Sequence, residues 1–181
     1  MKFCSACANP VEHTVPPGDN RLRYVCTSCN AIHYENPRVV CGCVPEWEDK
    51  ILLCRRAIEP RYGLWTLPAG FMENGETTAE AGVRETLEEA NARVEPLELF
   101  SLIDIPYLDQ IYMLYRATLL DLDYSAGSES LEVELFEETQ IPWEQLAFPA
   151  ITKTLAWYFA DRKDDAFKLH TGAIRGRAKP R

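Results

Sequence analysis

Three glutamates that lie close together in the chain have the types and spacing to do chemistry. Glu85, Glu88 and Glu89 fall at positions i, i+3 and i+4 of the segment GFMENGETTAEAGVRETLEEANA, residues 70–92. In an α-helix this spacing puts three carboxylates on one face. Crowded carboxylates repel one another unless a cation lies between them, and hard oxygen ligands suit Mg²⁺ or Mn²⁺. The segment therefore predicts a divalent-metal site beside a glycine loop, suited to a metal-bound phosphate.

The helix that must carry these glutamates has clear start and end signals. Thr77 and Glu80 fit a capping box with Thr77 as N-cap, and Asn91 suits a left-handed C-terminal cap. A helix is therefore expected over residues 78–90. A second, apolar helix is expected over residues 151–160. Strands are expected over 11–15, 22–26, 39–44, 51–55, 94–105, 111–119 and 132–136, with a hairpin at EWEDK.

Four cysteines in the first 36 residues form a second candidate site. Cys4 and Cys7, and then Cys26 and Cys29, make two C-x2-C pairs at the spacing of a structural zinc ribbon. Four thiolates close a tetrahedral shell and leave no position for water. The segment is too small to bury a core of its own, and zinc replaces that core.

The other metal-ligating side chains are interpreted as ordinary residues. Four cysteines already fill a zinc shell, so His13 and His33 are expected to be polar residues outside it. Cys41, Cys43 and Cys54 lie in expected strands, where buried cysteine behaves as a small apolar residue. A redox pair at Cys41 and Cys43 is the weaker alternative.

Composition limits the class of protein and suggests three regions. The formal net charge is −9 over 181 residues, which argues against a broad nucleic-acid surface. The sequence has no membrane-length apolar run and no secretory signal, and with seven cysteines it points to a reducing, cytoplasmic compartment. The expected regions are a ribbon over 1–36, a main domain over 37–170 and a solvated basic tail over 171–181, with a phosphate-contacting tail as the minority alternative.

The acidic segment resembles the Nudix box, the motif of the Nudix hydrolases. The similarity rests on Gly70, Glu76 and the run RETLEEANA over residues 84–92, although Asn91 stands for the usual glycine and Thr86 for a usual aliphatic residue. The resemblance implies an α+β fold, an α/β/α sandwich around a mixed sheet, preceded here by the Cys4 zinc ribbon.

The same resemblance implies roles for individual residues. Glu85, Glu88 and Glu89 are catalytic ligands of Mg²⁺ or Mn²⁺, assisted by a backbone carbonyl of Ala69 or Gly70. Gly70, Glu76 and Arg84 are structural. The implied reaction is hydrolysis of a nucleoside diphosphate derivative, in which the metal lowers the pKa of a bound water and a carboxylate positions or deprotonates that water. The general base is either a box glutamate or an acid of SAGSESLEVELF, among which Glu132 is preferred over Glu129 and Glu134.

Other segments point to a branch of the family. Five segments are similar to ribbon-bearing Nudix proteins that include plant plastid FAD pyrophosphatase. They are ENPRVVCGC, GLWTLPAGFMENGE, LIDIPYLDQIYMLYRATL, GSESLEVELF and IPWEQLAFPAI. The NADH pyrophosphatases also carry a ribbon, but their SQPWPFP motif is missing from EPLELFSLIDIPYLDQ. Pro106 matches a downstream proline of ADP-ribose pyrophosphatases. The resemblance therefore implies FAD or ADP-ribose as substrate, AMP as a product and a homodimer.

Three alternatives remain open at this point: a pyrophosphatase of NADH or another dinucleotide, an enzyme acting on RNA caps, and a non-catalytic, ligand-sensing zinc-ribbon regulator. The first hypothesis involves a small nucleotide substrate, no nucleic acid and no membrane. Such a substrate needs flat apolar surfaces and cations. Candidates for stacking are Trp65, Phe71 and Tyr107, with Tyr62 and Tyr112, and candidates for phosphate or ribose are Arg55 and Arg61, with Arg56.

Overall fold

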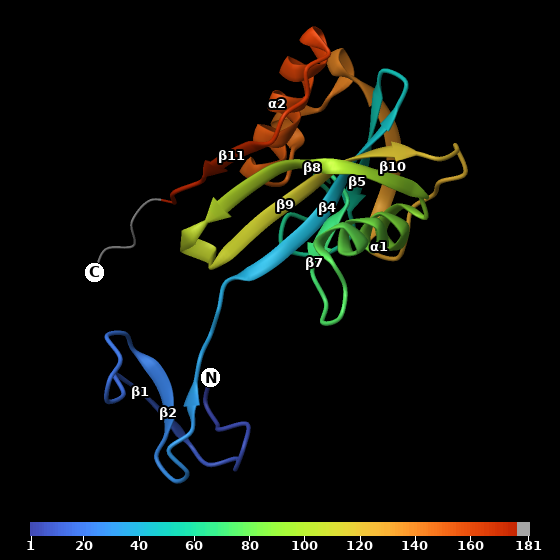
Figure 1. Cartoon of the computed structure of the whole chain (residues 1–181). Coiled ribbons are helices and arrows are strands. Elements are labelled where there is room, and N and C mark those ends of the chain that lie inside the picture. The colour runs from blue at the N-terminus through green and yellow to red at the C-terminus, as the bar shows by residue number, and fades with distance from the viewer. Residues whose placement is uncertain (177–181) are drawn as a thin grey trace. The chain divides into compact units, whose positions relative to one another are not determined.

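The computed structural model describes residues 1–176, which belong to two compact units divided after Pro37 (Figure 1). The first unit is a small antiparallel sheet of β1 (Val11–Thr14), β2 (Arg23–Cys26) and β3 (Ile32–His33), in the order β1-β2-β3. Its large apolar side chains are mostly exposed, including Phe3 and Tyr34. The unit therefore has almost no apolar core, and cross-linking by a metal is the way such a segment gains stability.

The second unit is built on one mixed sheet. Its main strands follow the order β10-β5-β4-β9-β8-β11, where β4 runs parallel to β9 and β8 runs parallel to β11. The other neighbours are antiparallel. This mixed sheet and its two helices confirm the expected fold class. The strands are β4 (Arg38–Trp47), β5 (Lys50–Arg56), β6 (Trp65–Thr66), β7 (Ala69–Phe71), β8 (Val94–Ile105), β9 (Gln110–Leu119), β10 (Ser130–Glu137) and β11 (His170–Ala173).

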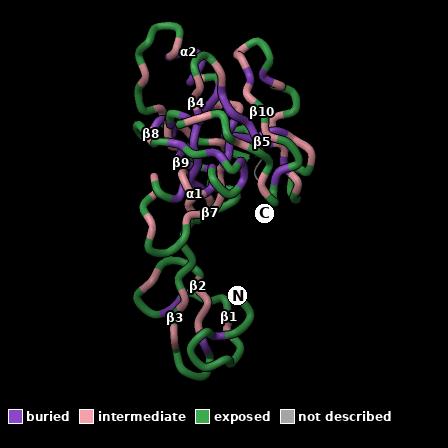
Figure 2. The backbone as a smooth tube through the Cα atoms, turned by 90° about the vertical axis from the view of Figure 1, so that its right-hand side faces the viewer, coloured by how far each residue is buried: buried purple, intermediate pink, exposed green. Residues whose placement is uncertain are grey.

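The two α-helices cover opposite faces of this sheet, because successive residues of a strand point in opposite directions. Leu53 of β5 packs in a cluster with Leu155 of α2 (Pro149–Asp164). Its neighbour Leu52 packs in another cluster with Ala90 of α1 (Thr78–Ala90). Figure 2 shows the buried residues concentrated along the central strands. Neither helix is long and apolar enough to cross a membrane. Three short 3-10 helices, η1 (Pro106–Leu108), η2 (Glu138–Gln140) and η3 (Trp143–Gln145), complete the described part of this unit.

Cys41, Cys43 and Cys54 are core residues, as expected. Their side chains are at most 1% exposed and form no disulfide. Burial raises the pKa of both Cys41 and Cys43 to about 11, so each stays a thiol at neutral pH. Because the thiolate is the reactive form, the alternative of a redox pair loses its chemical basis.

The C-terminal segment differs from the expected tail. We expected solvated residues from 171 onward, but β11 (His170–Ala173) is a strand of the sheet, paired in parallel with β8 over Ser101–Asp104. The segment LHTGA is too short and too polar to be read as a strand on its own. Its position depends on the exposed edge of β8, which is distant in sequence. The rest of the expected tail, residues 177–181, lies outside the described residues.

Candidate functional site

Helix α1 presents its glutamates from a rigid frame, and both of its predicted caps are confirmed. Thr77 Oγ1 accepts a hydrogen bond from the Glu80 amide at 3.2 Å, and the Glu80 carboxylate accepts one from the Thr77 amide at 2.7 Å. Asn91 adopts the left-handed conformation, with φ 47°. Thr86 is fully buried, and its hydroxyl donates to the Gly82 carbonyl at 2.7 Å. Neither departure from the expected motif therefore disturbs the helix.

Glu85 and Glu89 point from α1 into the loop at β7. They are 9% and 6% exposed. The Ala69 amide donates to Glu89 Oε2 at 3.2 Å, and the Glu85 carboxylate lies where a Cβ on Gly70 would stand. Only glycine at position 70 lets the backbone approach this carboxylate. Two of the three glutamates expected to converge, Glu85 and Glu89, thus meet the adjacent backbone in one small volume.

Burial and mutual repulsion disfavour the ionised form of these two carboxylates. Burial raises the pKa of Glu85. It also raises the pKa of Glu89 to about 8; Glu85 and Glu129 add to this rise, while the Ala69 amide and Arg56 oppose it. Two buried carboxylates that repel each other form a donor set that a hard divalent cation would stabilise. The residues therefore fit the metal that the Nudix motif implies.

Arg84 holds the loop against the helix. Its guanidinium forms a bidentate ion pair with Glu76, at 3.0 and 2.8 Å, and its Nη2 donates to the Phe71 carbonyl at 3.1 Å. Its Nη1 also contacts Glu85 at 2.8 Å and Glu88 at 3.0 Å. The hydrogen bonds from Arg84 lower the pKa of Glu76 to about 2. Glu88 differs from the other two box glutamates because its side chain is 58% exposed.

The loop before β10 carries an acid that was not chosen from the sequence. The amides of Ser125 and Gly127 donate to the carbonyls of Ala90 and Glu89, each at 2.9 Å, and Asn91 Nδ2 donates to Ser125 Oγ at 3.1 Å. These bonds satisfy carbonyls that the end of α1 leaves free. They also fix the loop that leads to Glu129, whose charge raises the pKa of both Glu85 and Glu89, burial being the larger cause.

Glu132, our preferred base, lies on a different face of the sheet from the box glutamates. It pairs across the sheet with Arg55, and its Oε2 accepts from Arg55 Nη1 at 3.3 Å. Cross-strand partners share a face of the sheet. Arg55 lies two residues from Leu53, which packs toward α2, so Glu132 lies on the face opposite α1. Glu129, by contrast, adds to the rise that burial causes in the pKa of Glu85 and of Glu89.

The alternation of side chains along β5 puts the neighbouring residues Arg55 and Arg56 on opposite faces of the sheet. Arg55 is held by Glu132 and by the Gly63 carbonyl, to which its Nε donates at 2.9 Å. Arg56 is 9% exposed, and its charge lowers the pKa of Glu89 against the larger effect of burial. Its Nε donates to the Pro60 carbonyl at 2.9 Å, and its guanidinium lies over the Phe148 ring. Among residues 1–176, Arg56 has no carboxylate partner.

The other expected substrate residues fall in different surroundings. Trp65 is 7% exposed and packs edge-on against Phe136, so it belongs to the core and offers no face for stacking. Phe71 and Tyr107 are about half exposed, and Arg38 lies over the Phe71 ring. Arg61 lines a shallow groove of about 390 Å³ together with six other residues, Leu146, Ala147, Pro149, Thr152, Lys153 and Ala156.

Tyr112 is a buried residue of β9 that packs in an apolar cluster with Ala150 of α2. It is 8% exposed, and burial raises the pKa of its phenol. Tyr107 adds to this rise and Arg56 opposes it. Alternation on β5 could have separated Arg56 from Arg55, provided the buried face had been assigned first.

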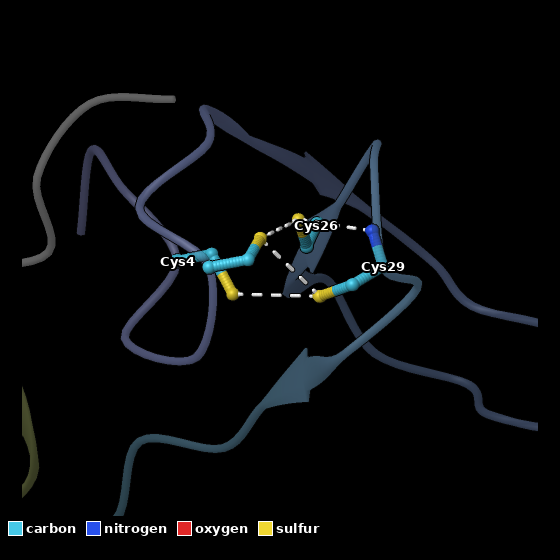
Figure 3. A group of neighbouring side chains, drawn as sticks. Cys4, Cys26 and Cys29 are labelled. Atoms are coloured by element: carbon cyan, nitrogen blue, oxygen red, sulfur yellow. Dashed lines mark hydrogen bonds between the residues drawn. The ribbon is translucent and has the colours of Figure 1, made fainter.

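The four cysteines of the first unit come together as predicted. Their sulfur atoms all lie within 4.8 Å of one another, and Cys4 Sγ and Cys29 Sγ are 3.7 Å apart (Figure 3). A tetrahedral zinc with Zn–S bonds of about 2.3 Å needs sulfurs about 3.8 Å apart. His33 Nε2 contacts Cys4 Sγ from outside this set at 3.3 Å, and His13 stacks on Tyr24. The donor set fits a structural zinc.

Comparison with known proteins places the chain in a family. Residues 2–35 match the family model described as Nudix N-terminal, and residues 36–158 match that of the NUDIX domain. The chain therefore belongs to the Nudix hydrolases, enzymes that use divalent metals. A Nudix hydrolase from Nitrosomonas europaea has a similar crystal structure, with 53% identity and a TM-score of 0.95 over 97% of this chain and 100% of that one.

Two curated relatives are more distant. The chain is 33% identical over 119 residues to an ADP-ribose pyrophosphatase of Methanocaldococcus jannaschii, which covers 64% of this chain and 69% of that protein. It is 28% identical over 149 residues to the NAD-capped RNA hydrolase NudC of Photorhabdus laumondii, which covers 78% of this chain and 53% of that protein. The chain thus spans about half the length of this NudC relative.

Loss of zinc is expected to unfold the first unit without unfolding the second. Binding of a structural zinc is worth about 10–16 kcal/mol in small zinc domains. The Cys29→Ser variant should therefore be cleaved rapidly by protease within residues 1–37. All four tryptophans lie beyond Pro37, so their fluorescence should report an intact second unit. Ser28→Ala is the matched control, and protease resistance of Cys29→Ser equal to that of the control would contradict a structural zinc site.

Proposed function

We propose that the protein is a Mg²⁺-dependent pyrophosphatase that cleaves the diphosphate of FAD or ADP-ribose and releases AMP. The observation that carries this proposal is the buried pair of Glu85 and Glu89 against the backbone at Ala69 and Gly70. Glu88, on the same helix but exposed, would be an outer ligand. Mn²⁺ is an equivalent choice by ligand type. When bound, the metal would neutralise negative charge on the diphosphate and lower the pKa of a water molecule.

Residues of the chain would perform the remaining work. Glu129 would accept the proton of the attacking water, in place of Glu132. Arg56 would bind phosphate oxygens, because its buried cation has no carboxylate partner in the described part of the chain. Tyr107 and Phe71, both about half exposed, would contact the flat half of the substrate. Arg61 would contact the substrate only where it reaches the shallow groove that Arg61 lines.

The branch of the family supports the choice of substrate. Similarity to the ribbon-bearing branch that includes plant plastid FAD pyrophosphatase favours FAD, and the relative from Methanocaldococcus jannaschii favours ADP-ribose. The NudC relatives favour NADH or NAD-capped RNA, but the net charge of −9 and the missing SQPWPFP motif oppose both. A non-catalytic sensor would not need a buried carboxylate pair. We also propose a homodimer in the cytoplasm.

A substrate panel tests this proposal. FAD, ADP-ribose, NADH and a short NAD-capped RNA are each incubated with the enzyme and Mg²⁺, and the products are identified by mass spectrometry. We expect AMP with FMN from FAD, or AMP with ribose 5-phosphate from ADP-ribose, at a kcat/KM at least tenfold above that for the other two. Faster turnover of NADH or of the capped RNA would overturn the choice of substrate but leave the class of enzyme intact.

A further inference from the structure

The last described segment, Phe167–Gly176, lies against α2 and then along the edge of the sheet. We call it the C-terminal strap. Its central part is β11, which extends the sheet beyond β8 (Figure 1). Edge strands that are short and polar add little stability by themselves. The strap is nevertheless held at both ends by specific contacts.

The first end is held by a buried carboxylate of α2. Asp161 is 8% exposed, and its Oδ2 accepts from the Lys168 amide at 3.2 Å and lies 2.8 Å from His170 Nε2. The His170 ring stacks on the Trp157 indole, with centroids 4.8 Å apart and planes at 13°. Phe167 packs against Tyr158 in the apolar cluster beneath α2. These contacts fix where the strap starts.

The second end reaches an aromatic residue that is a candidate for substrate binding. The Ile174 amide donates to the Asp104 carbonyl at 2.8 Å, and Ile174 packs on the apolar cluster that contains Tyr112. Gly176 lies against the ring of Tyr107, so closely that a Cβ at position 176 would be 2.8 Å from that ring. Tyr107 remains half exposed. The strap therefore supports the ring while leaving part of it open.

A continuous path leads from Tyr107 back to the carboxylates. Ile174 of the strap packs on the apolar cluster that contains Tyr112, and Ala69 packs on the same cluster. The Ala69 amide in turn donates to Glu89 Oε2 at 3.2 Å. The strap, this cluster and the backbone at Ala69 thus lie in succession between Tyr107 and the carboxylates. A substrate that spans two phosphates and a flat ring could follow this path.

We propose that the C-terminal strap determines specificity by fixing Tyr107 as a stacking surface for the flat ring of the substrate, adenine or flavin. Gly176, His170 and Asp161 are positioning residues, because they act through Tyr107. A ring that is already immobile loses less conformational freedom when the ligand stacks on it. This inference rests on the proposed function, since it uses the same substrate.

The test is a double-mutant cycle between the strap and the ring. Gly176→Val should displace Tyr107 and raise the KM for FAD and ADP-ribose by about tenfold, more than it lowers kcat, since stacking on one aromatic ring is worth about a factor of ten or more. In a Tyr107→Ala background the same substitution should change KM less than twofold. Asp161→Asn should raise KM by about threefold, because loss of one hydrogen bond to a charged group loosens the strap.

Matched controls exclude a general loss of folding. Thr171→Ala shortens an exposed side chain within the same strap, and Asp164→Asn removes an exposed carboxylate of α2, so both should behave as wild type. In a Glu89→Gln background, Gly176→Val should raise the Kd of FAD, measured by calorimetry. Because this measurement needs no hydrolysis, it separates the role of the strap from the proposed reaction. An unchanged Kd and KM in Gly176→Val, or an equal rise in KM with and without Tyr107, would overturn the inference.

Discussion

Replacing Glu89 by glutamine is expected to lower kcat by about 10³-fold at saturating Mg²⁺, because a bound metal contributes several kcal/mol to such a reaction and each 1.36 kcal/mol is tenfold. Glutamine keeps the shape of the side chain, and its amide oxygen still accepts from the Ala69 amide. Only the charge is lost. Steady-state hydrolysis of FAD or ADP-ribose over a range of Mg²⁺ concentrations measures the effect.

The same substitution is expected to leave the metal-free protein at least as stable as wild type. Burial raises the pKa of Glu89 to about 8, and Glu85 repels it, so the ionised side chain opposes folding at high pH. A folded-state pKa above the ordinary value means that this loss of stability grows as the pH rises from about 4.5 through 8. Glutamine is neutral throughout. Thermal unfolding at pH 9 should therefore show Glu89→Gln as the more stable protein.

Two other glutamates provide the comparison. Glu88→Gln should lose about tenfold in kcat, because Glu88 is 58% exposed and pairs with Arg84 as an outer residue of the cluster. Glu95→Gln, on the exposed side of β8, should match wild type. Full activity of Glu89→Gln would disprove the metal assignment. A loss of activity matched by a loss of stability would instead show a structural role for Glu89.

The sequence was most informative where structure is set by local contacts. The ends of α1 depend on Thr77, Glu80 and Asn91, which bond within a few residues of one another, so the expected and observed helix are the same, residues 78–90. The four cysteines were equally clear, because two short C-x2-C turns fix most of the zinc geometry. In both cases chemistry and spacing are contained within one short segment.

The sequence was least informative where the position of a residue depends on segments that are distant in the sequence. The strand β11 exists because β8 offers an edge, and no local pattern in LHTGA records this. Glu129 and Glu132 are the same type of residue, and only the register of β10 on β5 shows that Glu132 lies opposite Arg55. A one-residue change of register would exchange the two faces. Trp65 was chosen for its large ring, but burial against Phe136 decides its role.

Replacing Arg56 by methionine is expected to lower kcat/KM by about 10²-fold, since a charged hydrogen bond to substrate contributes about 1.5–3 kcal/mol. Among residues 1–176, only the Nε of the Arg56 guanidinium forms a hydrogen bond, which leaves its two terminal nitrogens for the substrate. Methionine retains much of the packing on Phe148 but removes the cation. Arg56→Lys should be intermediate, because lysine keeps the charge but cannot form the planar, bidentate contact. Steady-state kinetics of the three proteins with one substrate give the comparison.

Arg55→Met is the matched control for this prediction. Arg55 occupies the neighbouring position, but its charge is already balanced by Glu132 and its side chain is 41% exposed. Such an exposed ion pair is worth roughly 0–1 kcal/mol, so its loss should change kcat/KM by less than about fivefold. Equal losses in Arg55→Met and Arg56→Met would show that β5 merely needs intact arginines at its end. A loss confined to Arg56 would show that this buried cation, which has no carboxylate partner within residues 1–176, is held in place for an anionic substrate, because burying an uncompensated charge otherwise destabilises the fold.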